Sequence, residues 1–197
     1  MRSKPQPRAA SAIRIIGGSL RGSRLVVPAR DGLRPTPDRL RETLFNWLAP
    51  FIAGARCLDL YAGTGALGIE ALSRGAATCT FVERDAALAA HLRENLARLG
   101  VAAARVEVAD AVPWLAAGAA EPMDIVFLDP PFAAGLWQPS VDALEQYEWL
   151  APGALVHVES PAGSAPAVPA HWQVRREGHI GAVRHVLYRR AGADPLS

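Results

Sequence analysis

The chain has 197 residues, half of them hydrophobic, which suffices for one α/β domain with a full-sized core and a short appendage but leaves no room for a second domain. Its formal net charge of +2 hides an asymmetry, because residues 1–50 carry ten Lys/Arg against three Asp/Glu and the remainder carries eleven against sixteen. No apolar run approaches the ~18 residues of a membrane span, and no signal-peptide pattern follows the early basic residues, so we expect a soluble cytoplasmic protein.

The basic N-terminal part predicts a distinct extension over residues 13–50. Residues 13–18 and 24–28 are expected to form a small hairpin. A helix should follow, with Thr36 as its N-cap and Pro37 in its first turn. Apolar residues at helical spacing should pack this helix on the body. They are Leu40, Leu44, Phe45 and Leu48.

Six arginines of this extension are expected to be exposed. They are Arg14, Arg21, Arg24, Arg34, Arg39 and Arg41. Arginine suits bidentate contact with phosphate and stacking on bases, so we expect these side chains to contact RNA. The alternative is an ordinary solvated surface.

After the extension, the sequence alternates strand-like and helix-like patterns. Short runs rich in apolar or β-branched residues predict five buried parallel strands, at residues 56–60, 78–82, 105–108, 123–128 and 154–158. Helical patterns over residues 67–74 and 86–99 are each stopped by a glycine. Such alternation predicts a doubly wound α/β sheet.

Two further strands, at residues 172–176 and 183–188, are separated only by a glycine-containing segment and should form an antiparallel hairpin at one edge of the sheet. Residues 51–190 would thus form the main domain, between a disordered tail over residues 1–12 and a tail over residues 191–197. Cys57 and Cys79 lie in strand-like runs without metal-ligand spacing, so we expect buried thiols and no metal site.

The tetrapeptide Asp129-Pro130-Pro131-Phe132 follows a buried strand, at the end where open α/β sheets bind ligands. The two prolines remove backbone donors and fix φ, so the carbonyls of Asp129 and Pro130 should stay free and rigidly aimed. Such acceptors suit a planar exocyclic amine, whose ring would stack on Phe132. A proline-rich turn after a core strand is the structural alternative.

A second motif runs from Asp59 through Tyr61, Ala62, Gly63, Thr64 and Gly65 to Gly68. Its three glycines match the dinucleotide-binding pattern, and Glu83 stands where an acid would bind ribose hydroxyls. A carboxylate at Asp59, however, would oppose a pyrophosphate at the helix N-terminus and would favour an ammonium group.

Asp59, Glu83, Asp110 and Asp129 are predicted at the carboxyl ends of four strands, which suits a cationic ligand. S-adenosylmethionine has an ammonium, a sulfonium, a ribose diol and an adenine amine, each calling for an acceptor. We assign Asp59 and the glycine turn to its methionine end, Glu83 to the ribose, and Asp110 with Ala111 to the adenine. Asp129 would lie at the junction with the substrate. Alternatively, Asp110 caps a helix near Ala111 and Glu83 pairs with a surface cation.

Together, residues 14–18, 33–36, 38–46, 59–65 and 129–132 resemble the RsmD-type methyltransferases. The resemblance implies a Rossmann-like class I fold with a mostly parallel seven-stranded sheet. It also implies transfer of a methyl group from S-adenosylmethionine to N2 of one guanine in 16S ribosomal RNA, with the 129–132 motif holding the base and the N-terminal extension contacting RNA.

We expect a monomer that acts without a metal on folded RNA or an assembling small subunit. A methyltransferase that acts on DNA adenine N6 or protein glutamine is the main alternative, because relatives of the 129–132 motif serve those targets. A nicotinamide-dependent oxidoreductase would share the glycine turn, but in this sequence we expect neither its second domain nor an evident hydride site. A non-catalytic RNA-binding module would leave the acidic crevice unused.

Overall fold

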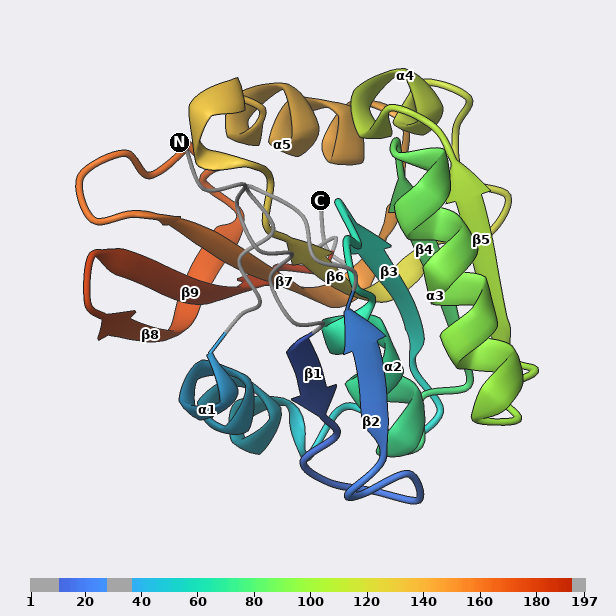
Figure 1. Ribbon diagram of the computed structural model, residues 1–197. Coiled ribbons are helices and arrows are strands. Elements are labelled where there is room, and N and C mark those ends of the chain that lie inside the picture. The colour runs from blue at the N-terminus through green and yellow to red at the C-terminus, as the bar shows by residue number, and fades with distance from the viewer. Residues whose placement is uncertain (1–10, 28–36, 193–197) are drawn as a thin grey trace, which may run out of the picture.

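The computed structural model describes residues 11–27 and 37–192. Within them, seven strands form one sheet in the order β5-β4-β3-β6-β7-β9-β8 (Figure 1). In chain order the strands are β3 (Arg56–Leu60), β4 (Thr78–Glu83), β5 (Ala104–Val108), β6 (Met123–Leu128), β7 (Leu150–Pro161), β8 (Trp172–Ile180) and β9 (Val183–Arg190). Strands β5, β4, β3, β6 and β7 run parallel, and β9 pairs antiparallel with both β7 and β8. The predicted doubly wound sheet with an antiparallel edge hairpin is confirmed.

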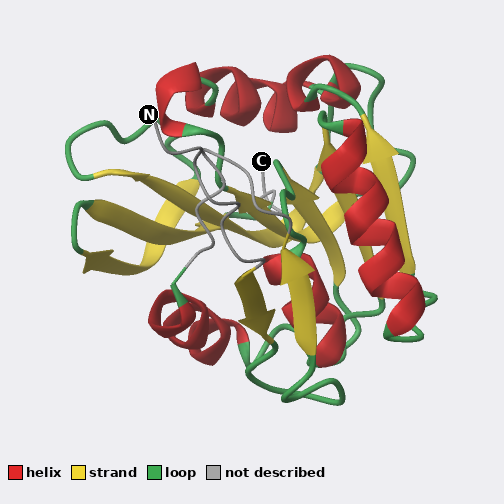
Figure 2. Ribbon diagram, in the orientation of Figure 1, coloured by secondary structure: helices red, strands yellow, loops and turns green. Residues whose placement is uncertain are grey.

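Helices cover both faces of this sheet (Figure 2). One face carries α1 (Asp38–Leu48), α2 (Ala66–Ser73) and α3 (Ala86–Arg98), and the other carries α4 (Ala111–Leu115) and α5 (Trp137–Gln146). Each strand between the two layers contributes alternate side chains to two cores, because successive strand residues point to opposite faces. None of the described helices is long and apolar enough to cross a membrane.

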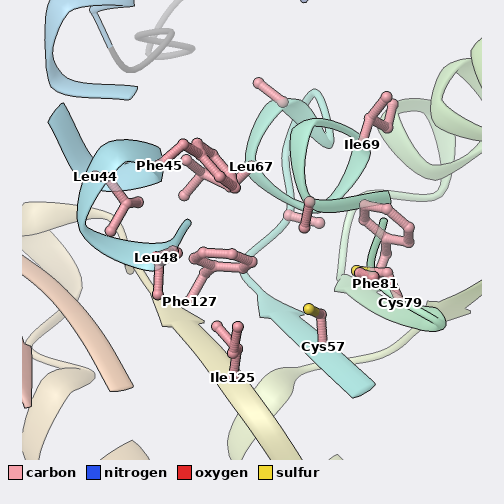
Figure 3. Close-up of a cluster of buried hydrophobic side chains, with 14 of the residues drawn as sticks. Leu44, Phe45, Leu48, Cys57, Leu67, Ile69, Cys79, Phe81, Ile125 and Phe127 are labelled. Carbon is pink, nitrogen blue, oxygen red and sulfur yellow. The ribbon is translucent and has the colours of Figure 1, made fainter. Parts of the chain in front are cut away.

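The core on the α1–α2–α3 face is drawn in Figure 3. The ring of Phe45 on α1 lies 5.9 Å, between centroids, from that of Phe127 on β6. Cys57 and Cys79, paired in the register of β3 and β4, are free and buried, as the sequence predicts. Burial raises the pKa of Cys57 to about 12, so this thiol stays protonated and packs as an apolar group.

Two strand predictions were wrong in detail. Strand β5 is only partly buried, because it forms the outer edge of the sheet rather than an interior strand. Strand β7 extends well beyond the expected residues 154–158, because its pairing with β9 continues to Pro161. Helix α5 was not predicted, although Trp137, Val141 and Leu144 recur at helical spacing and are all buried. Pro139 lies in the first turn of this helix, where proline is tolerated.

The N-terminal extension contains the predicted hairpin and helix. β1 (Ser11–Arg14) pairs antiparallel with β2 (Arg24–Val27), and α1 begins at Asp38. Pro37 therefore precedes the helix at the N-cap position instead of lying in its first turn. Strand β1 starts two residues before the expected boundary of the extension, while Arg34 and Thr36 lie outside the described residues.

A buried carboxylate on α2 ties this extension to the sheet domain. Glu70 accepts hydrogen bonds of 2.8 Å from the backbone amides of Ile16 and Gly17. Its side chain is fully buried and also accepts from Arg74 Nε at 2.7 Å. Ile15 and Leu25 of the extension belong to the same core as α1 and α2. The described parts of the extension are thus packed against the domain.

Candidate active site

The four predicted acids lie along one edge of the sheet. Asp59 is the penultimate residue of β3, Glu83 ends β4, Asp110 comes two residues after β5, and Asp129 directly follows β6. Since these strands are parallel and adjacent in the order β5-β4-β3-β6, their carboxyl ends meet at the same edge. The structure therefore brings together the acids that sequence reasoning grouped.

The glycine turn between β3 and α2 is held by Glu83. The amide of Gly63 donates to Glu83 Oε2 at 2.8 Å, and the amide of Asp85 donates to Glu83 Oε1 at 2.8 Å. The amide of Ala62 donates to the carbonyl of Val82 at 3.0 Å, which joins the turn to β4 a second time. Glu83 thus holds the glycine turn against the residue that precedes α3.

The turn itself needs glycine at two positions. Gly63 has φ 53° and Gly65 has φ 75°, a left-handed conformation that glycine adopts without strain. A Cβ on Gly65 would lie 2.3 Å from Leu92 Cδ1 of α3, and one on Gly68 would lie 2.3 Å from Phe81 Cε1 of β4. The glycines thus allow the turn and α2 to sit close to their neighbours. Thr64, between them, is half-buried.

Asp59 is almost completely buried, and its Oδ2 accepts a hydrogen bond of 2.9 Å from the amide of Gly68 in the first turn of α2. The pKa of Asp59 is raised to about 8, mainly by burial and also by the nearby Asp129 and Glu83, against the opposing effect of the Gly68 amide. A cation beside Asp59 would favour its ionised form. This is the environment expected of a group that binds an ammonium ion.

The proline motif has the predicted acceptors. Neither the carbonyl of Asp129 nor that of Pro130 accepts a hydrogen bond within the described part of the chain, whereas the carbonyl of Pro131 accepts from Ala134 at 2.9 Å. The carboxyl of Asp129 is half-buried, and burial raises its pKa to about 7. Phe132 is 43% exposed, with its ring 5.7 Å from that of Trp137. An aromatic face and three acceptor groups are therefore available at one place.

Asp110 occupies the N-cap position of α4, but its side chain makes no capping hydrogen bond. Its carboxyl is exposed, whereas the next residue, Ala111, is buried beneath the sheet edge. No side-chain hydrogen bond therefore supports the alternative interpretation of Asp110 as a helix cap. Its assignment to the adenine amine stays a prediction.

Sequence reasoning missed two contributors to this edge. Tyr61 in the turn forms a 2.7 Å hydrogen bond with Ser140 of α5, which links the glycine turn to a helix on the opposite face. Glu159, near the end of β7, is 96% buried beside the strand that carries Asp129. The sequence contains a signal for this residue, because Glu159 is a fifth acid at the carboxyl end of a fifth parallel strand.

The expected RNA-contacting arginines do not form one group. Arg14, Arg21, Arg24 and Arg39 are exposed, as predicted. The expectation that Arg41 is exposed was wrong: it is fully buried, its Nη2 donates to the carbonyl of Arg14 at 2.9 Å and to Asp38 at 2.6 Å, and its Nη1 lies 3.7 Å from Glu70. Helical spacing placed this residue on the packed face of α1.

The hairpin arginines lie far from the glycine turn. The loop between β1 and β2 is anchored at the C-terminal end of α2, where the amide of Ser19 donates to the carbonyl of Ser73 at 2.7 Å. The glycine turn is at the opposite end of this helix, about 12 Å away for an eight-residue helix. Among the arginines expected to contact RNA, Arg39 lines a groove near the acidic edge of the sheet.

That groove lies between α1 and the tip of the β8–β9 hairpin, and its lining includes Arg39, Thr43, His179 and His185. Because β9 runs antiparallel to β7, the hairpin tip is at the same edge of the sheet as the carboxyl ends of the parallel strands. The groove therefore adjoins the acidic edge. Among the described residues, no cluster of His, Cys, Asp and Glu has the arrangement of a metal site.

The chain is similar to a known protein family over most of its length. A family model described as Conserved hypothetical protein 95 matches residues 13–189. The Escherichia coli (strain K12) protein named Ribosomal RNA small subunit methyltransferase D is 50% identical over 188 residues, covering 95% of this chain and 94% of that protein. The Haemophilus influenzae protein of the same name is 41% identical over 192 residues, covering 96% of this chain and 100% of that protein.

The fold of the chain also matches that of a solved relative. The structure of yhhF from Escherichia coli gives a TM-score of 0.86 at 48% identity, covering 92% of this chain and 99% of that one. These relatives are similar over nearly their whole length, and the family model spans nearly the whole chain. The chain therefore belongs to the family described as Conserved hypothetical protein 95, and the resemblance to the RsmD-type methyltransferases is confirmed.

Proposed function

We propose that this chain transfers a methyl group from S-adenosylmethionine to the N2 amine of a guanine in small-subunit ribosomal RNA, as a monomer in the bacterial cytoplasm. The names of its relatives support the ribosomal substrate. The observation that carries the chemistry is the group of acceptors at Asp129 and Pro130, which lies beside the exposed ring of Phe132. An RNA base with an exocyclic amine fits this group.

The acidic edge fits the cofactor by the chemistry of its donors and acceptors. When bound, S-adenosylmethionine supplies an electrophilic methyl carbon, whose bond to sulfur breaks with its electron pair staying on sulfur. Asp59 would hold the ammonium group, because a cation offsets the burial of this carboxyl. Glu83, at the end of β4, would accept from the ribose hydroxyls, and Asp110 from the adenine amine.

The chain's own residues would activate the amine mainly by position and by hydrogen bonding. A guanine unstacked from the RNA would lie on Phe132, which presents an exposed aromatic face. Its two N2–H groups would donate to the carboxylate of Asp129 and the carbonyl of Pro130, which directs the nitrogen lone pair at the methyl carbon. These bonds strengthen as the nitrogen becomes positively charged, so they stabilise the transition state more than the bound substrate.

Asp129 is suited to remove the proton that N2 must lose. Its pKa of about 7 places it near the pH at which it would work as a base. After the N–C bond forms, one N2 proton passes to the Asp129 carboxylate and from there to solvent, which leaves a neutral methylated amine. No covalent bond between enzyme and substrate is required.

The groove between α1 and the β8–β9 hairpin offers RNA a route to this site, with Arg39 placed to contact a phosphate. A chain of this size contacts few nucleotides at once. We therefore propose that selectivity depends on the shape of folded RNA or of an assembling small subunit, where an unpaired guanine is cheaper to unstack.

The deciding experiment incubates the purified protein with radiolabelled S-adenosylmethionine and, separately, unmethylated small-subunit particles, naked 16S RNA, duplex DNA and soluble protein. Label recovered as N2-methylguanosine after nucleoside digestion would support the proposal and identify the substrate form. Label in adenine or in protein would keep the cofactor but replace the target. If no substrate is labelled while the protein binds RNA, the chain is an RNA-binding module instead.

A further inference from the structure

Glu159 lies next to the catalytic motif across two neighbouring strands. Leu128 of β6 is paired in register with Val158 of β7, and the following residues of the two strands are Asp129 and Glu159. Paired residues of parallel strands lie about 4.8 Å apart and point to the same face of the sheet. The two carboxyl groups therefore stand side by side on the face that carries α1 and α2.

The same residue is linked to the aromatic part of the motif. The indole Nε1 of Trp137 donates to the backbone carbonyl of Glu159 at 2.6 Å, and the ring of Trp137 contacts that of Phe132. On its other side, Glu159 is paired with His185 of β9, which lines the groove beside α1. Glu159 thus lies between the motif expected to hold the base and the groove that leads to it.

The Glu159 side chain has no partner that would explain its burial. It is 4% exposed, and its Oε1 accepts no hydrogen bond within the described residues. Burial raises the pKa of Glu159 well above its ordinary value, and the charges of Asp129 and Asp59 raise it further. Its neighbour His185 has an unpartnered Nδ1 and a pKa lowered by burial and by His179, so it supplies no positive charge. These surroundings favour the neutral form of the Glu159 carboxyl, which has one O–H donor and one carbonyl acceptor.

A neutral carboxyl complements one edge of guanine. Guanine presents the N1–H donor next to the N2 amine, and the O6 acceptor beyond it. A carboxylic acid can accept from N1–H with its carbonyl oxygen while its O–H donates to O6. Adenine places an acceptor and then a C–H beside its amine, so the acid could make only one of these two hydrogen bonds.

We propose that Glu159 selects guanine by pairing with its N1–H and O6 while Asp129 accepts from N2–H. This inference rests on the proposed function and adds its specificity-determining residue. A base that reaches the half-buried Asp129 lies beside Glu159, and the unpartnered Oε1 becomes paired only in that complex. An analogue that lacks the matching groups leaves the buried carboxyl unpaired, which disfavours its binding.

The test compares two RNA substrates that keep the 2-amine. Small-subunit RNA is assembled from two ligated pieces so that the methylated position is either guanine or 2-aminopurine, which lacks both N1–H and O6. For wild-type enzyme we expect transfer to guanine to exceed transfer to 2-aminopurine by about 10- to 100-fold in kcat/KM, as for two lost hydrogen bonds to a buried group.

Two substitutions then separate base reading from a structural role. Glu159→Gln retains a carbonyl acceptor and an N–H donor, so it should keep most of the preference for guanine. Glu159→Ala should bring transfer to guanine and transfer to 2-aminopurine to a similar level, because residue 159 then makes no contact that distinguishes the two bases. Ser160→Ala, a buried neighbour on the opposite face of β7, serves as the control and should keep the preference.

The outcomes distinguish this inference from the function on which it rests. An unchanged guanine preference in Glu159→Ala, or equal loss of activity toward both substrates in Glu159→Gln, would overturn the role of Glu159 while leaving guanine methylation intact. Label on a base other than guanine in wild-type enzyme would overturn the proposed function, and the role of Glu159 with it. Calorimetric titration with S-adenosylmethionine, expected to give unchanged affinity in all variants, identifies any that are misfolded.

Discussion

Glu83 joins two parts of the site that sequence reasoning treated separately, since its carboxylate accepts the amide of Gly63 at 2.8 Å. The acid expected to bind a ribose therefore also holds the turn expected to surround the cofactor. The Glu83 side chain thus fixes the shape of the glycine turn and is itself the acceptor expected to bind the ribose.

Replacing Glu83 by alanine should accordingly have two effects. Two amide partners are lost, at Gly63 and Asp85, and hydrogen bonds to a charged group contribute about 1.5–3 kcal/mol each. We expect the Tm to fall by at least about 4 °C and affinity for S-adenosylmethionine to fall by more than about tenfold. Scanning calorimetry and titration would measure these changes. Glu94→Ala, at an exposed site on α3, is the control, and equal behaviour of the two variants would contradict this role.

Replacing Asp129 by asparagine should separate transfer from cofactor binding. The carboxylate that accepts the N2 proton is lost, and a general base contributes about 10²–10⁴-fold to a rate. Single-turnover transfer should slow by that factor, with S-adenosylmethionine affinity kept within about threefold. In the wild-type enzyme, kcat/KM should rise with pH through about 7 and then level, because Asp129 must be ionised to accept a proton. Lost cofactor binding with unchanged turnover per bound cofactor would refute this division of roles.

Asp59→Asn should stabilise the protein without its ligand and weaken the ligand's binding. The pKa of Asp59 is raised from its unfolded value to about 8. Between pH 4 and 8 the folded state therefore keeps a proton that the unfolded chain has already released. Stability is therefore lost as pH rises through this window, and a neutral amide removes that loss. At pH 8 we expect the variant's Tm to exceed that of the wild type by at least about 2 °C. The Tm values of the variant and the wild type should converge near pH 4, as this linkage requires. A difference that persists at pH 4 would contradict it.

Arg39→Gln should weaken RNA binding more than Arg21→Gln. Arg39 lines the groove beside the catalytic edge, whereas Arg21 lies in the loop anchored at the far end of α2. Loss of one phosphate contact should make the plot of log affinity against log salt concentration shallower by about 0.7–0.9. Filter binding at several salt concentrations would show it. Equal slopes for Arg39→Gln and wild type would exclude a phosphate contact by Arg39.

Arg41→Ala should destabilise the fold, although this residue was expected to bind RNA. Arg41 is fully buried, donates to the carbonyl of Arg14 and lies 3.7 Å from the fully buried Glu70, so truncation opens a cavity and removes a positive charge from beside a buried carboxylate. We expect a loss of about 3 kcal/mol in the free energy of unfolding, measured by urea denaturation. Arg39→Ala, two residues earlier on the exposed side of α1, should be nearly neutral. An unchanged midpoint for Arg41→Ala would show that these buried contacts contribute little.

Local patterns predicted most of the fold because its elements are locally determined. The apolar runs of β3 and β6 were found to the residue, since both are central strands buried on two faces. Strand β5 was judged by the same pattern, but its position at the edge depends on strand order, which no local run encodes. The meeting of the four acids at one edge was predicted because parallel strands all end at the same edge.

Other features depend on contacts between distant segments. Helical spacing places Arg41 on the same face of α1 as Phe45, but the groups that pair with it there, the carbonyl of Arg14 and the Glu70 carboxylate, come from other segments of the chain. The role of Glu159 depends on its register with Asp129 and His185, which are 30 and 26 positions away along the chain. A buried acid without a partner becomes conspicuous only once its surroundings are known.

The amides of Ile16 and Gly17, which share the Glu70 carboxylate, bear on how this enzyme could be shortened. Cutting the chain at residue 50 would remove both amides from that buried carboxylate, leaving it with Arg74, and would uncover the part of the core that Ile15 and Leu25 now cover. A fragment that begins there would retain every proposed catalytic residue and still be expected to aggregate. We therefore expect this segment to be needed for obtaining the enzyme in soluble form, although it carries none of the proposed catalytic residues.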